Sequence, residues 1–313
     1  MEGTIPISSN ARIALVTGGS RGIGLEVCKQ LAASGITVVL TDRDDTKGTT
    51  AVEQIKQLGH SAHVMFHHLD VTDDASRIAR LADFLKSRFG KLDILVNNAA
   101  VDGNEPVIDP LYGLMPASEK FDGMDAQQRI EWMWTNSRQT YETAKQAVQT
   151  NYYGAKRVTE ALLPLLRSSS DGRIVNVSSN FGLLSFFRNE ELKRELNDID
   201  SLTEERLDEL LDVFLKDLVV GAVDARGWPA EFSAYKVSKA ALNAYSRILA
   251  KRHPELRVNC AHPGYVRTDI TRNSGILTPE EGAYNITGVV LLPAKGPTGA
   301  YFHEGSQASF VDM

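Results

Sequence analysis

Cysteine, long apolar runs and net positive charge are scarce or absent in this chain of 313 residues. Its two cysteines, Cys28 and Cys260, lack the spacing of a metal site, so we expect two reduced, packed thiols in a reducing compartment. No apolar run approaches the ~20 residues of a membrane-spanning helix, and the acidic start Met1–Pro6 is not a secretory signal. A formal net charge of −6 offers no field for nucleic acid or an anionic membrane. We therefore expect a cytoplasmic protein with neither partner.

The chain does contain a regular alternation of short apolar runs and helix-like segments. A composition of 42% hydrophobic and 24% charged residues is that of an ordinary globular protein. Strand-like runs alternate with the expected helices in the order Ile13–Val16, Leu25–Ala33, Thr37–Thr41, Thr46–Leu58, His63–His67, Asp74–Phe89 and Leu92–Val96. Such alternation implies right-handed crossovers and a parallel sheet covered by helices on both faces. We predict an α/β fold, a single Rossmann-like, doubly wound domain spanning residues 1–313, with a flexible tail at 1–10.

A glycine-rich turn, Thr17–Gly24, joins the first strand to the first helix with the spacing Gly-x-x-x-Gly-x-Gly. Glycines let the backbone approach a dinucleotide pyrophosphate, whose charge then faces the helix N-terminus. A plain connection is the alternative, but the correctly placed strand and helix favour a cofactor site. Polar residues end the later strands at Asp42-Arg43, Asp70 and Asn97-Asn98. Ligands of open parallel sheets bind at this carboxyl edge.

Tyr235 and Lys239 are four positions apart, so on a helix they project from one face. A phenol normally titrates near ~10, too high for proton exchange at neutral pH. A neighbouring ammonium favours the phenolate and should lower that pKa, which would make the tyrosine a usable acid or base. The same spacing also occurs on ordinary amphipathic helices, so the assignment depends on the rest of the chain.

The motifs of this chain, taken together and in order, resemble those of the short-chain dehydrogenase/reductase family over roughly residues 10–305. They are Thr17–Gly24, Leu69-Asp70-Val71, Asn97-Asn98-Ala99-Ala100, Asn151, Asn176-Val-Ser-Ser179, Tyr235-x-x-x-Lys239 and Pro263-Gly264-Tyr-Val-Arg-Thr268. One departure is Ala100, where the family usually has glycine. Its methyl group would tighten the cofactor pocket without removing a catalytic atom.

The resemblance implies a catalytic set of Asn151, Ser179, Tyr235 and Lys239. Ser179 would hold a substrate carbonyl oxygen; Ser178 competes for this role, but the family's Ser-x-x-Gly spacing selects Ser179. Tyr235 would donate the proton during reduction and take it back during oxidation. Lys239 would lower the tyrosine's pKa and bind the nicotinamide ribose, and Asn151 would hold a water that links Lys239 to solvent. Alternatively, Asn151 has no catalytic role and is simply a polar residue tolerated in a helix from about 140 to 166.

The same resemblance places a nicotinamide cofactor along the carboxyl edge of the sheet. Arg43, with Arg21 and Lys47, can pair with the 2′-phosphate of NADP, whereas Asp42 stands where an acidic residue binds the ribose hydroxyls of NAD. Because two or three cationic side chains face one carboxylate, we expect NADP(H) as the cofactor, and NAD(H) is the alternative because of Asp42. The expected cofactor contacts come from Gly18, Ser20, Arg21, Gly22, Ile23, Gly24, Asp42, Arg43, Lys47, Asp70, Val71, Asn97, Ala99, Tyr235, Lys239, Pro263, Gly264, Val266 and Thr268.

Two segments exceed what a minimal member of the family needs. Residues from about 102 to 139 should form an irregular flap, and residues from about 183 to 231 a helical insertion before the catalytic tyrosine. Ser201-Leu-Thr-Glu204 fits a helix capping box, and an apolar stripe follows it. The stripe consists of Leu207, Leu210, Leu211, Phe214 and Leu218. In the monomeric carbonyl reductase subgroup and its plant ketone reductases, such an insertion covers the usual oligomer interface, so we expect a monomer; extra core in an oligomer is the alternative.

The expected activity is that of an NADPH-dependent carbonyl reductase or secondary-alcohol dehydrogenase. Phe181, Phe186, Phe187 and Trp228 should line a pocket for a lipophilic, terpenoid- or alkaloid-like ketone or alcohol. We expect no metal, because His67 and His68 are adjacent on a strand and point to opposite faces. The alternatives are an NAD-dependent alcohol dehydrogenase, a catalytically inactive dinucleotide-binding sensor or scaffold, and a sugar-nucleotide epimerase.

Overall fold

A computed structural model describes residues 11–60, 63–107 and 120–312. The tail predicted at residues 1–10, and the part of the flap from 108 to 119, lie outside the described residues. The fold prediction is confirmed: one mostly parallel sheet has the strand order β10-β9-β8-β7-β4-β1-β2-β3, with only β10 antiparallel to its neighbour. The strands are β1 (Ile13–Thr17), β2 (Thr37–Asp42), β3 (Val64–His68), β4 (Ile94–Asn97), β7 (Arg173–Val177), β8 (Arg257–His262), β9 (Tyr301–His303) and β10 (Ser306–Ala308).

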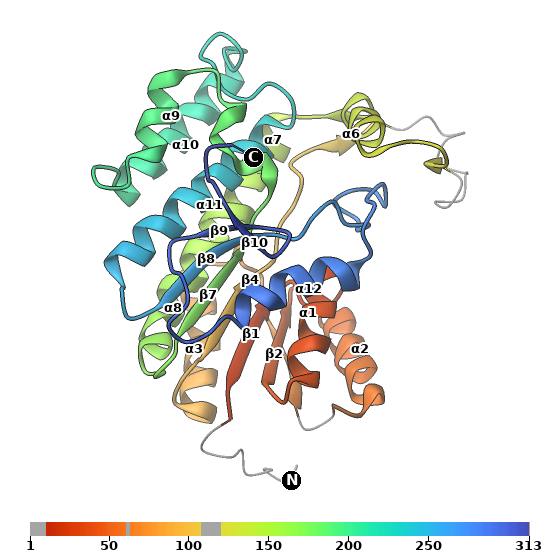
Figure 1. Ribbon diagram of the computed structural model, residues 1–313, viewed down its shortest axis with the longest axis vertical. Helices are drawn as coiled ribbons and strands as arrows, with labels where there is room; N and C mark the ends of the chain where they lie inside the picture. The colour runs from red at the N-terminus through yellow and green to blue at the C-terminus, as the bar shows by residue number, and fades with distance from the viewer. Residues whose placement is uncertain (1–10, 61–62, 108–119, 313) are drawn as a thin grey trace.

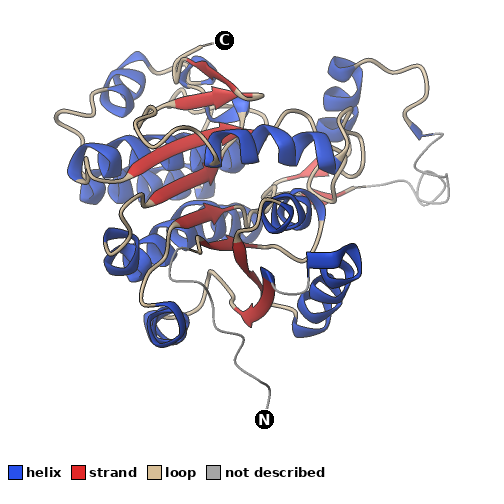
Figure 2. Cartoon of the chain, turned by 60° about the horizontal axis from the view of Figure 1, so that its bottom comes forward, coloured by secondary structure: helices blue, strands red, loops and turns tan. Residues whose placement is uncertain are grey.

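Helices cover both faces of this sheet (Figures 1 and 2). Successive residues of β1 enter different cores, because side chains of a strand alternate between its two faces. Ala14 and Val16 join the core under one helix layer, and Ile13 and Leu15 join the other. The first layer consists of α1 (Gly22–Ala33), α2 (Asp45–Ile55) and α12 (Pro279–Val290), and α2 continues into the π-helical turn η1 (Lys56–His60). The second layer consists of α3 (Ala75–Phe89), α8 (Ala155–Arg167) and α11 (Ser233–Arg252). In the described parts of the chain, no helix is both long and apolar enough to cross a membrane.

The long helix expected from about 140 to 166 is present but contains a π-helical stretch. It runs as α7 (Tyr141–Ala147), η3 (Val148–Gly154) and α8, and η3 contains Asn151. A π-turn inserts one extra residue into the helical ladder and is frequently found at functional sites. The periodicity of the sequence indicated the helix, but not this local change in its winding.

The insertion before α11 comprises η5 (Leu184–Phe186), α9 (Glu190–Asn197) and α10 (Glu204–Val219). The cap of α10 is Thr203, whose side chain accepts from the Arg206 backbone N–H, so the predicted capping role of Ser201 is wrong. The stripe of α10 was expected to cover the helices that carry Asn151 and Tyr235, and α10 does pack against α7 and α11. Four stripe residues, Leu207, Leu210, Leu211 and Phe214, are buried there, and Leu218 is partly buried.

Polar contacts also attach α10 to the helix that carries Asn151. The Tyr152 hydroxyl donates to an Asp208 carboxylate oxygen at 2.8 Å, and Lys156 Nζ lies 2.9 Å from the other oxygen. Lys156 lies 3.4 Å from the buried carboxylate of Glu204 as well. These buried or half-buried groups pair with one another at the interface between the insertion and the sheet's helix layer.

The flap is more ordered than its prolines suggested. It contains α6 (Ala126–Thr135), capped by reciprocal bonds between Asp125 and Gln128, and a small ladder of β5 (Glu105–Pro106) with β6 (Ser137–Arg138). In Figure 1 this part extends beside the carboxyl ends of the strands. The prediction of a wholly irregular segment is therefore wrong for residues 120–139, where the capping pair was visible in the sequence.

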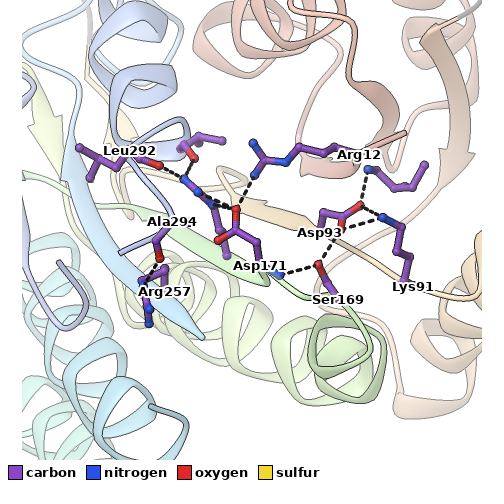
Figure 3. A network of polar contacts seen from close by, with 11 residues as sticks. Arg12, Lys91, Asp93, Ser169, Asp171, Arg257, Leu292 and Ala294 are labelled. Atoms are coloured by element: carbon purple, nitrogen blue, oxygen red, sulfur yellow. Dashed lines mark hydrogen bonds and ion pairs between the residues drawn. The ribbon is translucent and has the colours of Figure 1, made fainter. Parts of the chain in front are cut away.

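A polar network closes the opposite, amino edge of the sheet (Figure 3). The buried carboxylate of Asp93 accepts from the Ile13 backbone N–H at 2.8 Å, from Lys91 Nζ at 3.1 Å and from Ser169 Oγ at 2.5 Å. Buried Arg173 donates to Asp171 and to the carbonyl of Val290 at 2.9 Å. The network thus joins the starts of β1, β4 and β7.

Replacing Asp93 with alanine should lower the free energy of unfolding by about 3–5 kcal/mol, because it leaves a buried N–H, a lysine and a hydroxyl without their acceptor. Denaturant unfolding would measure the loss. Asp83, an exposed residue of α3, provides the control, and its alanine variant should stay within about 0.5 kcal/mol of the parent. Equal stabilities of the two variants would contradict the importance of the network.

Candidate active site

Two adjoining cavities lie at the carboxyl ends of the strands, and Ile23, Asn98, Ala100, Thr268 and Ile270 line both. The larger, about 810 Å³, runs along the glycine turn and the end of β2. The smaller, about 150 Å³, contains Ser179, Tyr235 and Lys239. The sequence motifs therefore meet at the edge of the sheet where ligands bind in open α/β folds.

The glycine turn has the geometry of a cradle for a pyrophosphate. A Cβ at Gly24 would lie 2.3 Å from the Gly18 carbonyl oxygen and 2.4 Å from Asn98 Nδ2, so no larger residue fits there. Asn98 Nδ2 holds the turn by donating to the carbonyls of Thr17 and Gly18, both at 3.0 Å. No side chain caps the N-terminus of α1, so its first backbone N–H groups remain for an anion. These residues fit a dinucleotide.

The acidic and basic residues after β2 are held differently. Asp42 accepts from Ser20 Oγ at 2.5 Å and from the Asp44 backbone N–H at 3.0 Å. Lys47 pairs with Asp44 at 3.1 Å. Arg43 is exposed and makes no ion pair or hydrogen bond with any described residue, although it lines the larger cavity. The carboxylate of Asp42 is therefore fixed by its own loop, while the Arg43 guanidinium is available to a ligand.

The second cavity brings three of the four predicted catalytic residues together. Tyr235 lies in the first turn of α11, whose start is capped by Gln139: its Oε1 accepts from the Ala234 backbone N–H at 2.9 Å. Lys239, one turn further, lies with Nζ 5.6 Å from the centre of the Tyr235 ring and donates to the Val177 carbonyl at 2.7 Å. The Ser179 hydroxyl at the end of β7 is a hydrogen-bonding partner of the Tyr235 phenol.

The direction of the Tyr235 pKa differs from the sequence expectation. Burial raises it to about 12, and Asp102 adds to the rise, while the hydrogen bond with Ser179 lowers it. Burial likewise lowers the pKa of Lys239 to about 8. The expected net lowering by Lys239 was wrong, because the loss of water around the buried phenol outweighs its polar neighbours.

Ser178 and Ser179 have different partners in the structure. Ser178 is buried and its hydroxyl donates to Asn243 Oδ1 at 2.6 Å, which ties β7 to the catalytic helix. In the described part of the chain, the Ser179 hydroxyl accepts from the Phe181 backbone N–H at 3.1 Å, has a long contact of 3.3 Å with Asn180, and otherwise partners only the Tyr235 phenol. Ser179 is therefore the serine with capacity for a ligand, which supports the choice that the Ser-x-x-Gly spacing made.

Asn151 does not line either cavity. Its Oδ1 accepts from the Val101 backbone N–H at 2.9 Å, and its Nδ2 donates to the Val101 carbonyl at 2.9 Å and to Ser238 Oγ at 3.0 Å. Both amide N–H groups are thus used within the protein. The side chain links η3 to the chain after β4 and to the catalytic helix, and the predicted water link to Lys239 stays a prediction.

Most of the expected cofactor residues line the cavities, but two do not. Ser20 orients Asp42 instead, and Asn97 is buried between Thr159 and Asn176. Asn98, not Asn97, lines the cavity, since neighbouring residues at the end of a strand point in opposite directions. Sequence reasoning missed several lining residues of the larger cavity, for which the chain carries no distinctive spacing: Thr72, Lys145, Gln146, Gln149 and Arg267.

The wall of the small cavity is mainly apolar and aromatic, but only one of the four predicted pocket residues belongs to it. Phe181 lines the cavity, and Phe186 packs behind it with ring centres 5.6 Å apart. Phe187 and Trp228 are instead core residues, and the Trp228 indole donates to Asp217 at 2.9 Å. Among the lining residues that sequence reasoning missed are Asp102, Ile130, Met133, Phe232 and Tyr265.

Comparisons with known proteins agree with this geometry. A family model described as short chain dehydrogenase matches residues 12–111 and 120–190. The chain is 43% identical to (+)-neomenthol dehydrogenase of Capsicum annuum, over 95% of this chain and 96% of that one. It is 36% identical to carbonyl reductase [NADPH] 1 of Homo sapiens, over 95% and 98% of the two chains. The solved structure of salutaridine reductase from Papaver somniferum superposes with a TM-score of 0.86 at 45% identity, covering 93% of this chain and 99% of that one.

Proposed function

This chain belongs to the short-chain dehydrogenase family and is an oxidoreductase, and we propose that it reduces bulky, apolar ketones with NADPH or oxidises the corresponding secondary alcohols. The observation that carries the proposal is a phenol, a serine hydroxyl and a lysine in a mainly apolar cavity that adjoins the dinucleotide cradle. Two of the relatives are named for compounds of this kind: neomenthol is a terpenoid alcohol, and salutaridine is an alkaloid ketone. A substrate of that class suits the aromatic wall.

The chain's own residues would orient the ketone and supply its proton. Bound NADPH would supply the hydride. The Ser179 hydroxyl would donate to the ketone oxygen and hold it beside Tyr235, and the phenol of Tyr235 would give its proton to that oxygen as negative charge develops there. Lys239 has two N–H groups beyond the one given to Val177, and these can bind the ribose and steady the phenolate that remains. Asn151 would position the catalytic helix through Ser238.

NADP(H) is the proposed cofactor because of the charges around the 2′ position. Asp42 is already engaged by Ser20 and Asp44, whereas the Arg43 guanidinium lies on the cavity wall and pairs with none of the described residues. A guanidinium binds a phosphate through two charge-assisted hydrogen bonds. The name of the human relative, which includes NADPH, agrees with this choice.

A substrate panel tests the proposed function directly. Purified protein would be mixed with NADPH or NADH and with cyclic terpenoid ketones, small ketones, sugars and keto acids, and consumption of the reduced cofactor would be followed by absorbance. We expect turnover of the bulky, apolar ketones with NADPH. Tight NADPH binding without turnover of any carbonyl compound would instead favour a sensor or scaffold, and selective turnover of charged substrates would exclude an apolar pocket.

The pKa values of the site predict how ketone reduction depends on pH. Reduction needs the protonated phenol of Tyr235, with a pKa of about 12, and the ammonium of Lys239, with a pKa of about 8. Both groups are protonated below pH about 8, so kcat/KM for the ketone should be level there and fall as pH rises through the pKa of Lys239. A profile that stays level well above pH 8 would show that Lys239 does not control the rate.

We also propose that the protein is a monomer in the cytoplasm. The insertion covers α7 and α11, the helices that would otherwise offer an apolar surface, and Cys28 and Cys260 are buried free thiols that fit a reducing compartment. Light scattering should give a mass near the 34.4 kDa of one chain. A stable mass of two or four chains would overturn the monomer proposal without affecting the chemistry.

A further inference from the structure

Two histidines that the reduction does not use meet at the edge of the sheet. β8 and β9 are parallel neighbours in the sheet (Figure 1). Their register pairs His262 with His303. Paired residues on parallel strands project to the same face. The two imidazole rings accordingly lie with their centres 4.9 Å apart and their planes tilted by 42°.

Glu304 brings a carboxylate to the same place. It follows His303 in the two-residue hairpin turn to β10, with φ of +46° at Glu304 and +83° at Gly305, values typical of a type I′ turn. Its backbone N–H donates to the His262 carbonyl at 3.0 Å, and its carboxylate lies 3.8 Å from His303 Nε2. One donor atom from each of the three residues lies within 4.8 Å of the other two.

One ring nitrogen of each imidazole is buried without a hydrogen-bonding partner in the described part of the chain. Nδ1 of His262 and Nδ1 of His303 are both inaccessible and make no hydrogen bond within the described part of the chain, and His262 is only 6% exposed. Leaving a buried polar atom unpaired costs about 1–3 kcal/mol.

We propose that His262, His303 and Glu304 form a site for a divalent transition-metal ion, with Zn²⁺ the best-suited ion. Two imidazole nitrogens and one carboxylate are a common ligand set for zinc, and three protein ligands leave a fourth position for water. Bonds of about 2.0–2.2 Å require the three donor atoms to draw closer than they lie now. Side-chain rotation at His303 and Glu304, both partly exposed, can supply this movement.

The proposed ion would lie next to the reactive cavity. His262, Pro263 and Gly264 are consecutive residues of the cavity wall, and a Cβ at Gly264 would lie 3.1 Å from the Glu304 carboxylate. Asn285 already holds this turn from the other side by donating to the Pro263 carbonyl at 2.9 Å. Zinc bound to His262 and Glu304 would therefore hold the turn at Pro263 and Gly264 from both sides. A turn that can no longer move would slow the reduction in the adjoining cavity.

Calorimetric titration of the full chain with ZnCl₂ alone, and Co²⁺ absorption spectra, would test the site without any turnover. Wild type should bind one ion tightly, His303→Gln and Glu304→Gln should bind at least tenfold more weakly, and His68→Gln should bind like wild type. His68 is the matched control because it pairs with Asp45 in an exposed histidine–carboxylate cluster. No binding by wild type, binding by His303→Gln equal to wild type, or loss of binding in His68→Gln would each overturn the site.

The effect on the cavity is tested separately and depends on the proposed ketone reductase activity. Added Zn²⁺ should lower turnover of wild type several-fold, a chelator should restore it, and His303→Gln should be insensitive. Neither His303 nor Glu304 lines the reactive cavity, so both variants should keep the metal-free rate. Equal inhibition of wild type and His303→Gln, or none in either, would overturn the coupling even if zinc binds.

Discussion

Replacing Tyr235 with phenylalanine should reduce ketone turnover by roughly 10²–10⁴-fold while NADPH binding stays almost unchanged. The substitution removes the one phenol on the cavity wall that Ser179 contacts, and keeps the ring that packs edge-on against Phe181 with centres 6.4 Å apart. Because the fold and the larger cavity are unaffected, the loss should appear in the chemical step. Single-turnover kinetics with saturating NADPH, together with a fluorescence titration of the cofactor, would separate the two quantities.

Tyr245→Phe provides the matched control for this experiment. Tyr245 lies on the same helix, is fully buried and is not part of either cavity, so its variant should keep the wild-type rate. Turnover by Tyr235→Phe within a few-fold of wild type would discard Tyr235 as the proton donor. Equal losses in both tyrosine variants would point to damage of α11 rather than to missing chemistry.

Replacing Arg43 with alanine should weaken NADPH binding by about 10–100-fold and leave NADH binding nearly unchanged. The size follows from losing one or two charge-assisted hydrogen bonds to the 2′-phosphate, each worth about 1.5–3 kcal/mol before solvent and flexibility reduce it. The NADPH affinity of Arg43→Lys should fall between those of wild type and Arg43→Ala, since lysine keeps the charge but lacks the planar guanidinium. Dissociation constants for both cofactors, measured with all variants, provide the comparison.

Asp42→Asn tests the opposing charge. The amide keeps an oxygen that can accept from Ser20 or Asp44, so the loop should stay in place while the repulsion of a phosphate disappears. NADPH binding should then become tighter. A wild type that prefers NADH, with NADH binding lost selectively in Asp42→Asn, would show that the carboxylate and not Arg43 decides the choice.

The first part of the sheet was predictable because β1, β2 and β4 each contain a continuous apolar run. The ends of the elements were less so: the first helix begins at Gly22, inside the glycine turn, and not at Leu25. We predicted an irregular flap because the segment contains Pro106, Pro110 and Pro116, and this prediction missed the helix that follows them. The pair Asp125 and Gln128 was the available signal, since it satisfies a capping box just before a run that includes Ile130 and Met133.

Closeness in sequence misled the prediction of the substrate pocket. Phe187 follows Ser179 closely, but the short 3₁₀ turn η5 directs it into the core, where it packs with Trp228 and Phe214. Phe232 and Tyr265 reach the cavity from segments far from Ser179 in the sequence, and the motif Pro263–Thr268, which contains Tyr265, gave no sign that this side chain lines the substrate pocket. The pKa of Tyr235 could not be inferred either, because it depends on how much water surrounds the phenol, and that is a property of the packed protein.

The polar network around Asp93 also bears on how this protein could acquire new substrates. It lies at the amino edge of the sheet, whereas the cavities lie at the carboxyl edge, and strands of about five residues keep the two roughly 15 Å apart. Substitutions that far apart and without shared partners usually have additive effects on stability. Stabilising substitutions in the network should therefore compensate for the destabilisation that accompanies substitutions in the pocket wall, without altering the reaction.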